Sequence, residues 1–416
     1  MGRFLISLAL AATLSASDAI PASEFKQRRE KLRAKLEGGT LVLFGATDAE
    51  HGDLRSGFFQ EANFYYLTGW TEPGAILLLD AKRDSLVLPT RNAVVERYTG
   101  PKAAAIDPDI RQRSGFDSVL PMPSLESTLF KMLEESQSVY SNPRHEGAVK
   151  LKSLLAMREI RDAHPLIAML RVTKSASELA MMNQTINVTI EAHRAAWKAI
   201  KPGLYEYQIA TIMTSAYSTA GCERNAYPPI VGSGGNSTIL HYNSNRRRMD
   251  GGEVLLMDVA AECSYYASDI TRTVPVSGKF TPRQREIYDI VLGAQNAALA
   301  AVKPGMTMAK TGEGSLNKIA FDYINTHGKD LKGEPLGKYF THGLGHHVGL
   351  DVHDPAPPNS PLEEGMVITL EPGIYIPEEG IGVRIEDMVL VTKEGGKLLS
   401  GDLPRAADEI ERSLAR

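Results

Sequence analysis

Apolar and polar positions divide the chain into two halves with different patterns. In the first half, short apolar runs typical of buried strands are separated by amphipathic stretches typical of helices. The predicted strands are 40–44, 63–68, 75–80 and 85–89, and the predicted helices are 24–35 and 124–135. This alternation predicts an α/β domain over residues 20–166. Its polar residues show no pattern typical of a catalytic or metal-binding site, so we expect this domain to be structural.

The second half contains two long helix signals. Ser175 and Glu178 fit a capping box, in which each side chain bonds the backbone N–H of the other residue. The helix that follows is expected to continue to Lys201, next to the Pro202-Gly203 stop. A second helix is predicted to begin at Thr281-Pro282 and to end at a similar Pro-Gly stop.

These two helices belong to a longer internal repeat. Residues 192–204 and 294–306 share seven identities in thirteen aligned positions. Downstream of each helix, a Gly-led apolar strand ends in a carboxylate, and a second carboxylate follows on another strand-like segment. The carboxylates are Asp258 and Asp269 in the first copy, and Glu371 and Glu386 in the second. The repeat predicts one α/β module used twice, with four carboxylates from two β-hairpins meeting at a seam.

Four acids at the ends of apolar strands need electrostatic compensation. A buried ionised carboxylate costs on the order of several kcal/mol in desolvation unless a cation pairs with it. The apolar neighbours contain too little Lys or Arg to pair with four. Any one of these acids alone would more often be an exposed residue at a hairpin end. All four in repeated contexts favour a divalent metal site.

Histidine placement supports this metal site. Of the ten histidines, four fall within residues 341–354, and His241 ends a Gly- and Ser-rich segment in the first module. The four are His342, His346, His347 and His353. Neutral imidazole is a common metal ligand. Taken singly, each histidine is more often a hydrogen-bonded structural residue, so the clustering carries the prediction.

Composition narrows the possible functions. The 416 residues include 46 Lys and Arg against 50 Asp and Glu, a net charge of −4, without basic blocks. This balance gives no positively charged segment of the kind that binds nucleic acid. The length suits two or three domains of about 100 to 200 residues. Cys222 and Cys263 cannot build a thiolate cluster, so metal ligands must be His and carboxylates, and a disulfide between the two stays open.

The N-terminus carries an export pattern. Arg3 precedes an apolar run over residues 4–14, and small residues follow at 17–19. This pattern predicts a signal peptide over residues 1–19 and a secreted or periplasmic protein. A membrane-spanning helix needs roughly 20 apolar residues, about twice this run, so no stable membrane anchor is expected.

Five residues together resemble the ligand signature of the pita-bread metallopeptidases. They are Asp258, Asp269, His346 in His-Gly-Leu-Gly-His, Glu371 in Glu-Pro-Gly, and Glu386 in Arg-Ile-Glu-Asp. In the first half, 63–69 and 71–74 resemble the N-terminal domain of the Xaa-Pro aminopeptidase (aminopeptidase P) family. The resemblance implies an N-terminal α/β domain, followed over residues 167–416 by a duplicated, pseudo-twofold pita-bread catalytic domain.

The resemblance also implies a role for each ligand. Asp258 is expected to bind one of two divalent ions, Asp269 and Glu386 to bridge both, and His346 with Glu371 to complete the second. Manganese is favoured by family precedent, with cobalt, iron or zinc as alternatives. The implied reaction is hydrolysis of the N-terminal Xaa-Pro bond of a peptide, with a hydroxide bridging the two ions as nucleophile.

Other residues receive roles around the substrate. Glu371 is expected to move a proton to the leaving nitrogen, and His353 to stabilise the developing oxyanion. His241 and His342 are expected to line the cleft, although His342 could instead support loop geometry. Arg384 either orients a metal carboxylate, receives a substrate carboxylate or is a simple strand-face residue.

Two alternatives remain open. A prolidase would use the same metal site but cleave only Xaa-Pro dipeptides. A non-catalytic pita-bread protein would bind peptides, although such proteins are expected to lack several ligands that are present here. Expected partners are peptides with proline at the second position and further copies of the chain, as a dimer or tetramer. No nucleic acid partner is expected.

Overall fold

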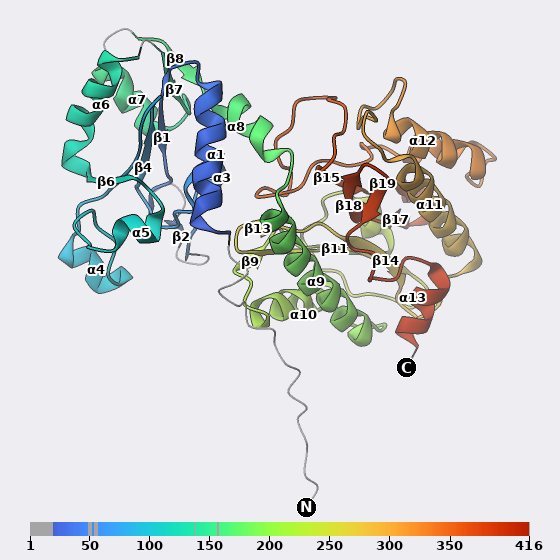
Figure 1. Ribbon diagram of the computed structural model, residues 1–416. Coiled ribbons are helices and arrows are strands. Elements are labelled where there is room, and N and C mark those ends of the chain that lie inside the picture. Colours follow the sequence, from blue (N-terminus) through green and yellow to red (C-terminus); the bar gives the residue numbers. More distant parts are fainter. Residues whose placement is uncertain (1–19, 49–51, 54–56, 137, 156–157, 416) are drawn as a thin grey trace, which may run out of the picture. The chain divides into compact units, whose positions relative to one another are not determined.

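The computed structural model describes residues 20–48, 52–53, 57–136, 138–155 and 158–415 (Figure 1). The predicted signal peptide, residues 1–19, lies outside the described residues. Contacts divide the described chain into two compact units, 20–172 with 355–357, and 173–354 with 358–415. No helix in the described ranges has both the length and the apolar character needed to cross a membrane.

The first unit is built on a mixed six-stranded sheet with the order β6-β5-β4-β1-β7-β8. β1 pairs antiparallel with β4, and β4 with β5, whereas the three outer pairings are parallel. The strands are β1 (Thr40–Phe44), β4 (Ile76–Leu79), β5 (Asp84–Leu88), β6 (Ser118–Pro121), β7 (Val139–Ser141) and β8 (Ile160–Asp162), and β2 (Gly52–Asp53) and β3 (Gly57–Phe58) form a separate pair. The strands predicted at 40–44, 75–80 and 85–89 are thus confirmed as β1, β4 and β5.

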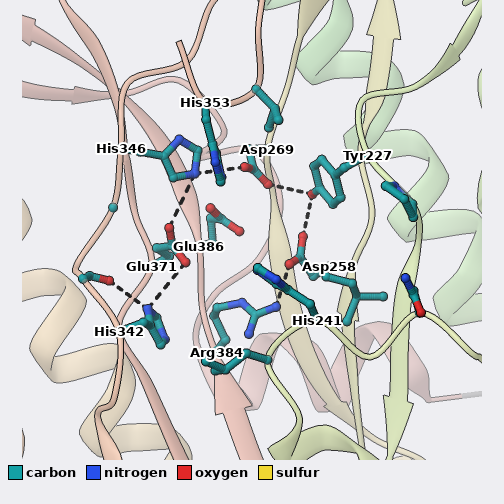
Figure 2. A pocket seen from close by; sticks show the side chains of 17 residues that line it. Tyr227, His241, Asp258, Asp269, His342, His346, His353, Glu371, Arg384 and Glu386 are labelled. Carbon is teal, nitrogen blue, oxygen red and sulfur yellow. Dashed lines mark hydrogen bonds and ion pairs between the residues drawn. The ribbon is translucent and has the colours of Figure 1, made fainter. Parts of the chain in front are cut away.

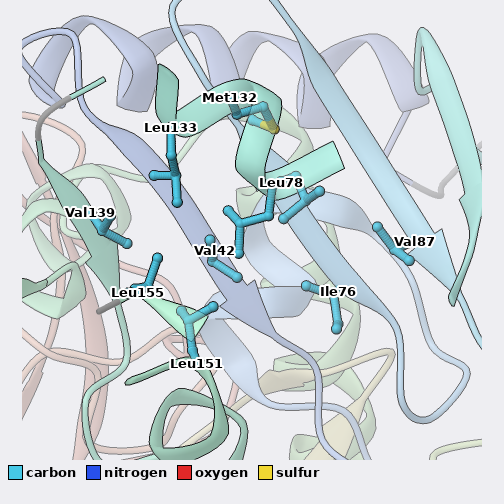
Figure 3. Close-up of a cluster of buried hydrophobic side chains, with 10 residues drawn as sticks. Val42, Ile76, Leu78, Val87, Met132, Leu133, Val139, Leu151 and Leu155 are labelled. Carbon is cyan, nitrogen blue, oxygen red and sulfur yellow. The ribbon is translucent and has the colours of Figure 1, made fainter. Parts of the chain in front are cut away.

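Helices flank this sheet. They are α1 (Ala22–Lys35), α3 (Ala62–Thr68), α4 (Ala93–Thr99), α5 (Ile110–Ser114), α6 (Leu125–Glu134), α7 (Glu146–Leu154) and α8 (His164–Arg171). A core cluster joins sheet residues such as Val42 and Leu78 to Leu129 and Leu133 of α6 and Leu151 of α7 (Figure 3). Burial of these side chains against one sheet face is the main favourable contribution to the stability of this unit.

Residues 63–68 are helical, so the strand predicted there is wrong. The Glu61 side chain caps α3 by accepting the Phe64 N–H at 2.7 Å. Gly69 ends the helix in the left-handed conformation, with φ 64°. The aromatic residues that favour a strand by composition instead bury Phe64 and Tyr66 along the helix. The two caps therefore outweigh the strand propensity of the segment.

The division between the units falls after Val172, whereas the sequence placed it near residue 166. The reason is α8, which packs against α1 and α3. The Tyr66 hydroxyl of α3 donates to the Leu170 carbonyl at 2.8 Å, and Arg171 Nη1 donates to Asn63 Oδ1 at 2.7 Å. These contacts assign the whole helix to the first unit.

The second unit contains the predicted module twice. In each copy a packed helix pair is followed by an antiparallel three-stranded ladder, and a short β-hairpin is inserted between two ladder strands. The first copy comprises α9 (Ala176–Ala199), α10 (Glu206–Thr219), β9 (Arg224–Asn225), β10 (Ile230–Ser233), β11 (Val254–Asp258), β12 (Ala261–Cys263), β13 (Tyr266–Ala267) and β14 (Thr271–Pro275). The second comprises α11 (Pro282–Ala301), α12 (Leu316–His327), β15 (Val367–Leu370), β16 (Gly373–Ile376), β17 (Ile381–Arg384), β18 (Asp387–Thr392) and β19 (Gly395–Leu398), with α13 (Ala407–Leu414) after it.

Both predicted helix starts are confirmed. Ser175 and Glu178 form the capping box of α9, and Thr281 and Gln284 form one at α11, where Pro282 is the first helical residue. α9 ends at Ala199, slightly before the predicted end. Each capping box satisfies backbone N–H groups that would otherwise lack partners at the start of a long helix.

The two ladders are joined by hydrogen bonds at one seam. The Glu386 N–H donates to the Thr271 carbonyl at 3.1 Å, and Thr271 Oγ1 donates to Glu386 Oε2 at 2.6 Å. The Arg384 N–H donates to Thr273 Oγ1 at 3.1 Å. The start of β14 is thus fixed against the connection between β17 and β18, which places the carboxylate-bearing ends of both modules side by side.

Cys222 and Cys263 form a disulfide, which settles the pairing that the sequence left open. The bond links the segment after α10 to β12, and the two Cα atoms lie 4.4 Å apart. Next to it, Arg224 Nη2 lies 2.6 Å from Glu262 Oε1, and the Ala226 N–H donates to the Ala260 carbonyl at 2.9 Å. Disulfides of this kind are typical of proteins that fold in an oxidising compartment.

Replacing both cysteines, as Cys222→Ala with Cys263→Ala, should destabilise the second unit. The bond spans 41 positions, and releasing a loop of this length from the unfolded chain corresponds to about 4 kcal/mol in the chain-entropy model. Thermal unfolding with chelator present would measure the loss without a contribution from bound metal. Wild-type protein treated with a phosphine reductant serves as the matched control and should unfold at the same lower temperature. Equal unfolding temperatures for wild type and double variant would refute the expectation.

Candidate active site

A pocket of about 530 Å³ lies in the second unit (Figure 2). All nine residues that the sequence singled out as ligands or catalytic groups line it, namely Asp258, Asp269, His346, Glu371, Glu386, His241, His342, His353 and Arg384. Apolar side chains, including Ile230, Leu240 and Val352, share the lining. The structure thus brings the predicted residues together, while their individual chemical roles stay predictions.

Each ladder supplies two of the carboxylates. Asp258 is the last residue of β11, and Glu371 directly follows the last residue of β15. Asp269 stands two residues before β14 begins, and Glu386 stands directly before β18. Equivalent strand ends of the two modules therefore meet in one pocket.

Three side chains lie close enough to share a metal ion. One ligand atom from each of Asp269, His346 and Glu386 lies within 4.8 Å of the other two. His346 Nε2 is 3.3 Å from Asp269 Oδ2 and 3.5 Å from Glu371 Oε1. Two carboxylates with an imidazole, and a third carboxylate beside them, form a donor set that suits a divalent cation.

His346 is held in place by its own backbone. Its N–H donates to Thr369 Oγ1 at 3.1 Å, and its carbonyl accepts the Thr369 N–H at 2.8 Å. Its Nδ1 lies 3.0 Å from the His347 carbonyl, which can only accept, so Nδ1 carries a proton and Nε2 is the available ligand atom. A Cβ at Gly345 would lie 2.2 Å from the Thr369 carbonyl oxygen, so this close approach requires glycine.

The carboxylates are buried at high electrostatic cost. Asp258, Asp269 and Glu386 are 8%, 5% and 2% exposed. Burial raises the pKa of Asp258, although the nearby Arg384 opposes this rise. Burial, reinforced by Asp269 and Glu371, holds the pKa of Glu386 well above its usual range. The fully charged set therefore needs more positive charge than the protein itself supplies, and a divalent cation fits that requirement.

Glu371 and His346 are a neighbouring acid and base of the pocket, and both have raised pKa values. Burial raises the pKa of Glu371 to about 7, while His346 and Arg384 oppose the rise. For His346, burial disfavours the charged ring, but its hydrogen bond to Asp269 and the charges of Asp269 and Glu371 outweigh burial and raise the pKa to about 9. In the metal-free protein, protons thus occupy sites where a cation would bind.

Arg384 orients a carboxylate and a chain of hydrogen bonds. Its Nη2 donates to Asp258 Oδ2 at 2.6 Å, and its Nη1 donates to the Tyr375 hydroxyl at 2.9 Å. Tyr375 in turn lies 2.8 Å from His342 Nε2, and His342 Nδ1 lies 2.8 Å from the Gly343 carbonyl. Because guanidinium only donates and a carbonyl only accepts, the tyrosine hydroxyl donates to His342 Nε2. Of the three roles left open for Arg384, its contacts match orientation of a proposed metal carboxylate.

Burial, together with Arg384, lowers the pKa of His342 to about 4. A neutral ring is what the chain of hydrogen bonds requires, because Nε2 must accept. His342 is therefore a neutral group at physiological pH. It lies at the Arg384 end of the pocket in Figure 2, with its Nδ1 3.8 Å from Glu371 Oε2.

Tyr227 is a site residue that the sequence did not reveal. Its hydroxyl lies 2.5 Å from Asp258 Oδ1 and 2.6 Å from Asp269 Oδ1, so it sits between the two carboxylates of the first module (Figure 2). Burial, and then the charges of Asp258 and Asp269, raise its pKa well above the usual range, so it stays a donor. Its position depends on the pairing of β9 with β12, and no local sequence signal marks it.

The remaining histidines differ in their surroundings. The rings of His353 and His346 lie 4.1 Å apart between centroids, and burial lowers the pKa of His353. His241 lines the pocket from the loop between β10 and β11. His347 does not line it, and burial with the nearby Lys174 lowers its pKa to about 4. The structural reading of His347 therefore fits its position, whereas His353 and His241 face the pocket.

Known proteins resemble both units of this chain. A family model described as metallopeptidase family M24 matches residues 180–393, and one described as aminopeptidase P, N-terminal domain, matches residues 25–140. Xaa-Pro aminopeptidase of Haemophilus influenzae is 33% identical over 95% of this chain and 98% of its own length. Escherichia coli aminopeptidase P with the inhibitor Pro-Leu covers 95% of this chain and 98% of its own at a TM-score of 0.85 and 29% identity. The zinc-substituted E. coli enzyme in complex with product matches equally, with a TM-score of 0.86.

Metal should stabilise this protein more as the pH rises. The raised pKa values of Glu371 and Glu386 mean that the folded metal-free protein holds more protons than the unfolded chain, so its free energy of unfolding falls with increasing pH. His346, with a pKa of about 9, contributes in the same direction. A bound cation replaces these protons. The gap in unfolding temperature between metal-loaded and chelator-treated protein should therefore widen from about pH 5.5 to about pH 8.

The Glu386→Gln variant provides the control for this measurement. It removes one of the buried ionisable groups, so its chelator-treated form should lose less stability across the same pH range. A gap that stays constant with pH in the wild type would contradict the pKa directions given above.

Proposed function

The chain belongs to the aminopeptidase P group of metallopeptidase family M24, and we propose that it is a metal-dependent Xaa-Pro aminopeptidase, a hydrolase that releases the N-terminal residue of peptides with proline second. The observation that carries this proposal is the juxtaposition of Asp269, His346 and Glu386 in a pocket that two further carboxylates line. The relatives that are named Xaa-Pro aminopeptidases favour peptide substrates over the dipeptides of a prolidase.

The proposed cofactor is a pair of divalent ions, with manganese first and cobalt, iron or zinc as alternatives. Asp258, Asp269, His346, Glu371 and Glu386 would hold them. Oxygen ligands with one imidazole suit these ions, and the disulfide leaves Cys222 and Cys263 without a thiolate that would select a softer metal. When bound, such ions polarise the scissile carbonyl and supply an activated water. Metal analysis of the purified protein tests both the number and the identity of the ions.

Glu371 and His353 have positions that suit proton transfer and charge stabilisation. The Glu371 carboxylate lies beside both His346 and His342, and a carboxyl with a pKa near neutrality can take up and release a proton at physiological pH. His353 lines the same pocket and lies beside the ring of His346, so its N–H can donate to an oxyanion that forms there. Arg384 and Tyr227 hold Asp258 in place.

Apolar lining residues offer a niche for the proline ring. Ile230 and Tyr375 belong to one buried cluster, against which Leu240 packs. Ile230 and Leu240 also line the pocket next to His241. A proline nitrogen carries no N–H after peptide bond formation, so its recognition depends on ring shape and on apolar contact rather than on a hydrogen bond from that nitrogen. This side of the pocket is therefore the proposed proline site.

A peptide panel tests the proposed activity. Metal-loaded protein should cleave Xaa-Pro-Yaa peptides, act poorly on Xaa-Pro dipeptides and leave Xaa-Ala-Yaa peptides intact. The Asp269→Asn variant should lose about 10² to 10³ of the rate, because weakened metal binding removes several kcal/mol of charge stabilisation. Cleavage confined to dipeptides would favour a prolidase. Absence of any cleavage by protein that binds metal would favour a non-catalytic peptide-binding protein.

Removing the His353 ring should slow the chemical step. The His353→Ala variant is expected to lower kcat by about 10² to 10³, the usual effect of losing one oxyanion donor. Its metal content should match the wild type, as measured by elemental analysis. His327→Ala is the matched control, because His327 stacks on Tyr323 of α12 and does not line the pocket. An unchanged kcat in His353→Ala would contradict the proposed role of His353 in stabilising the oxyanion.

A further inference from the structure

One wall of the pocket is formed by a loop rather than by a ladder. It connects β10 to β11 and begins with a short 3-10 helix over Gly234–Thr238. Leu240, His241 and Asn243 of this loop line the pocket. Among the residues that the structure describes, none is a hydrogen-bond partner of the His241 ring. The position of this ring therefore depends on what holds the loop.

One buried carboxylate, Glu206, accepts hydrogen bonds from the loop on both sides of His241. Glu206, the first residue of α10, is fully buried. Its Oε1 accepts the Ser233 N–H at 2.8 Å, the Ser233 hydroxyl at 2.8 Å and Asn236 Nδ2 at 3.1 Å. Its Oε2 accepts the Tyr242 hydroxyl at 2.9 Å and the Arg247 N–H at 2.9 Å. Glu206 thus contacts the beginning, the middle and the end of the segment 233–247.

The hydrogen-bond donors around Glu206 require a carboxylate at this position. Each oxygen of Glu206 faces a backbone N–H, that of Ser233 on one side and that of Arg247 on the other. Backbone N–H groups can only donate. A glutamine would place its NH₂ group against one of them in either orientation of the amide. A neutral side chain of the same shape therefore leaves a buried donor unpaired, which is costly.

The backbone next to Glu206 is fixed independently of its side chain. The Glu206 N–H donates to the Arg247 carbonyl at 3.0 Å, and the Met249 N–H donates to the Leu204 carbonyl at 2.8 Å. Arg247 also forms an ion pair with Glu253, with 2.6 Å between Nη1 and Oε2.

Ser237 Oγ accepts the Gly382 N–H at 2.8 Å, and Asn245 Oδ1 accepts the Val231 N–H at 2.9 Å. Loss of the carboxylate would thus loosen the loop between these two anchors, which contains His241, while the flanking strand pairing persists.

We propose that Glu206 is a positioning residue for substrate binding, which sets the loop that presents Leu240 and His241 to the peptide. The inference rests on the proposed aminopeptidase function and extends it, because Glu206 itself does not line the pocket. The proposed metal ligands belong to the ladders and to the segment of His346, so their arrangement should not depend on Glu206. A binding defect without a metal defect is the expected signature.

The Glu206→Gln variant tests this role in the full, metal-loaded chain. KM for an Xaa-Pro-Yaa peptide should rise roughly tenfold, the effect of losing one charge-assisted hydrogen bond, while kcat changes less than KM. Metal content should equal that of the wild type. Glu178→Gln is the matched control: Glu178 is also a buried carboxylate near a helix start and accepts from the Ser175 N–H and the Tyr266 hydroxyl, but it lies outside the pocket. This control should leave KM unchanged.

A milder variant keeps the inference testable if Glu206→Gln does not fold. Tyr242→Phe with Asn236→Ala removes two loop donors from the same carboxylate and leaves both backbone donors paired. It should raise KM in the same direction by a smaller factor. An unchanged KM in a folded, active, metal-loaded variant would overturn the inference alone. A wild-type protein that is inactive on every peptide would instead overturn the proposed function.

Discussion

The second unit is organised around the mutual repulsion of four carboxylates in one pocket, of which three are buried and Glu371 is partly buried. Burial raises the pKa of Asp258 and Glu386, and the like charges beside them raise it further, so the metal-free protein binds protons there. Arg384 pairs with one carboxylate, Asp258, and a protonated His346 compensates the charges of Asp269 and Glu371. These two cations do not balance the negative charge of four ionised carboxylates. A divalent cation relieves this repulsion without protons, so the same arrangement that weakens the metal-free fold creates affinity for metal.

A buried network of hydrogen bonds next to the pocket holds the carboxylates in place against this repulsion. Arg272, fully buried, donates through Nη1 to the Glu386 carbonyl at 2.7 Å and through Nη2 to Asp387 Oδ1 at 2.7 Å. Gln295 of α11 donates to the Leu370 carbonyl at 3.0 Å and to Asp387 Oδ2 at 3.0 Å. These bonds fix the backbone just before Glu371 and at Glu386. The carboxylates are therefore held by main-chain anchors and cannot move apart without breaking a satisfied buried network.

The predictability of each feature follows from the range of the interactions that create it. The carboxylates proposed as metal ligands and the cap at Ser175 stand in recognisable sequence patterns, so the sequence predicts their positions. The sequence predicts a strand at 63–68 because its aromatic residues favour one. The structure has a helix there, which Glu61 and Gly69 cap. Tyr227 and the disulfide arise from the pairing of β9 with β12, two elements far apart in the sequence, and no local pattern encodes that contact. Export and oligomeric state stay predictions, the first because its residues lie outside the described ranges.

Duplication explains why the pocket is nearly symmetric in its acids and asymmetric in everything else. Each module contributes a carboxylate at the end of one strand and another before the next, and the modules are joined at the seam by Thr271 and Glu386. The additions differ: the first module brings Tyr227 and the loop anchored by Glu206, and the second brings His342, His346 and Arg384. A symmetric set of acids can hold cations but cannot distinguish the two sides of a scissile bond. The unequal additions supply that distinction, because the first module adds the apolar Ile230 and Leu240 to the lining and the second adds His342 and Arg384.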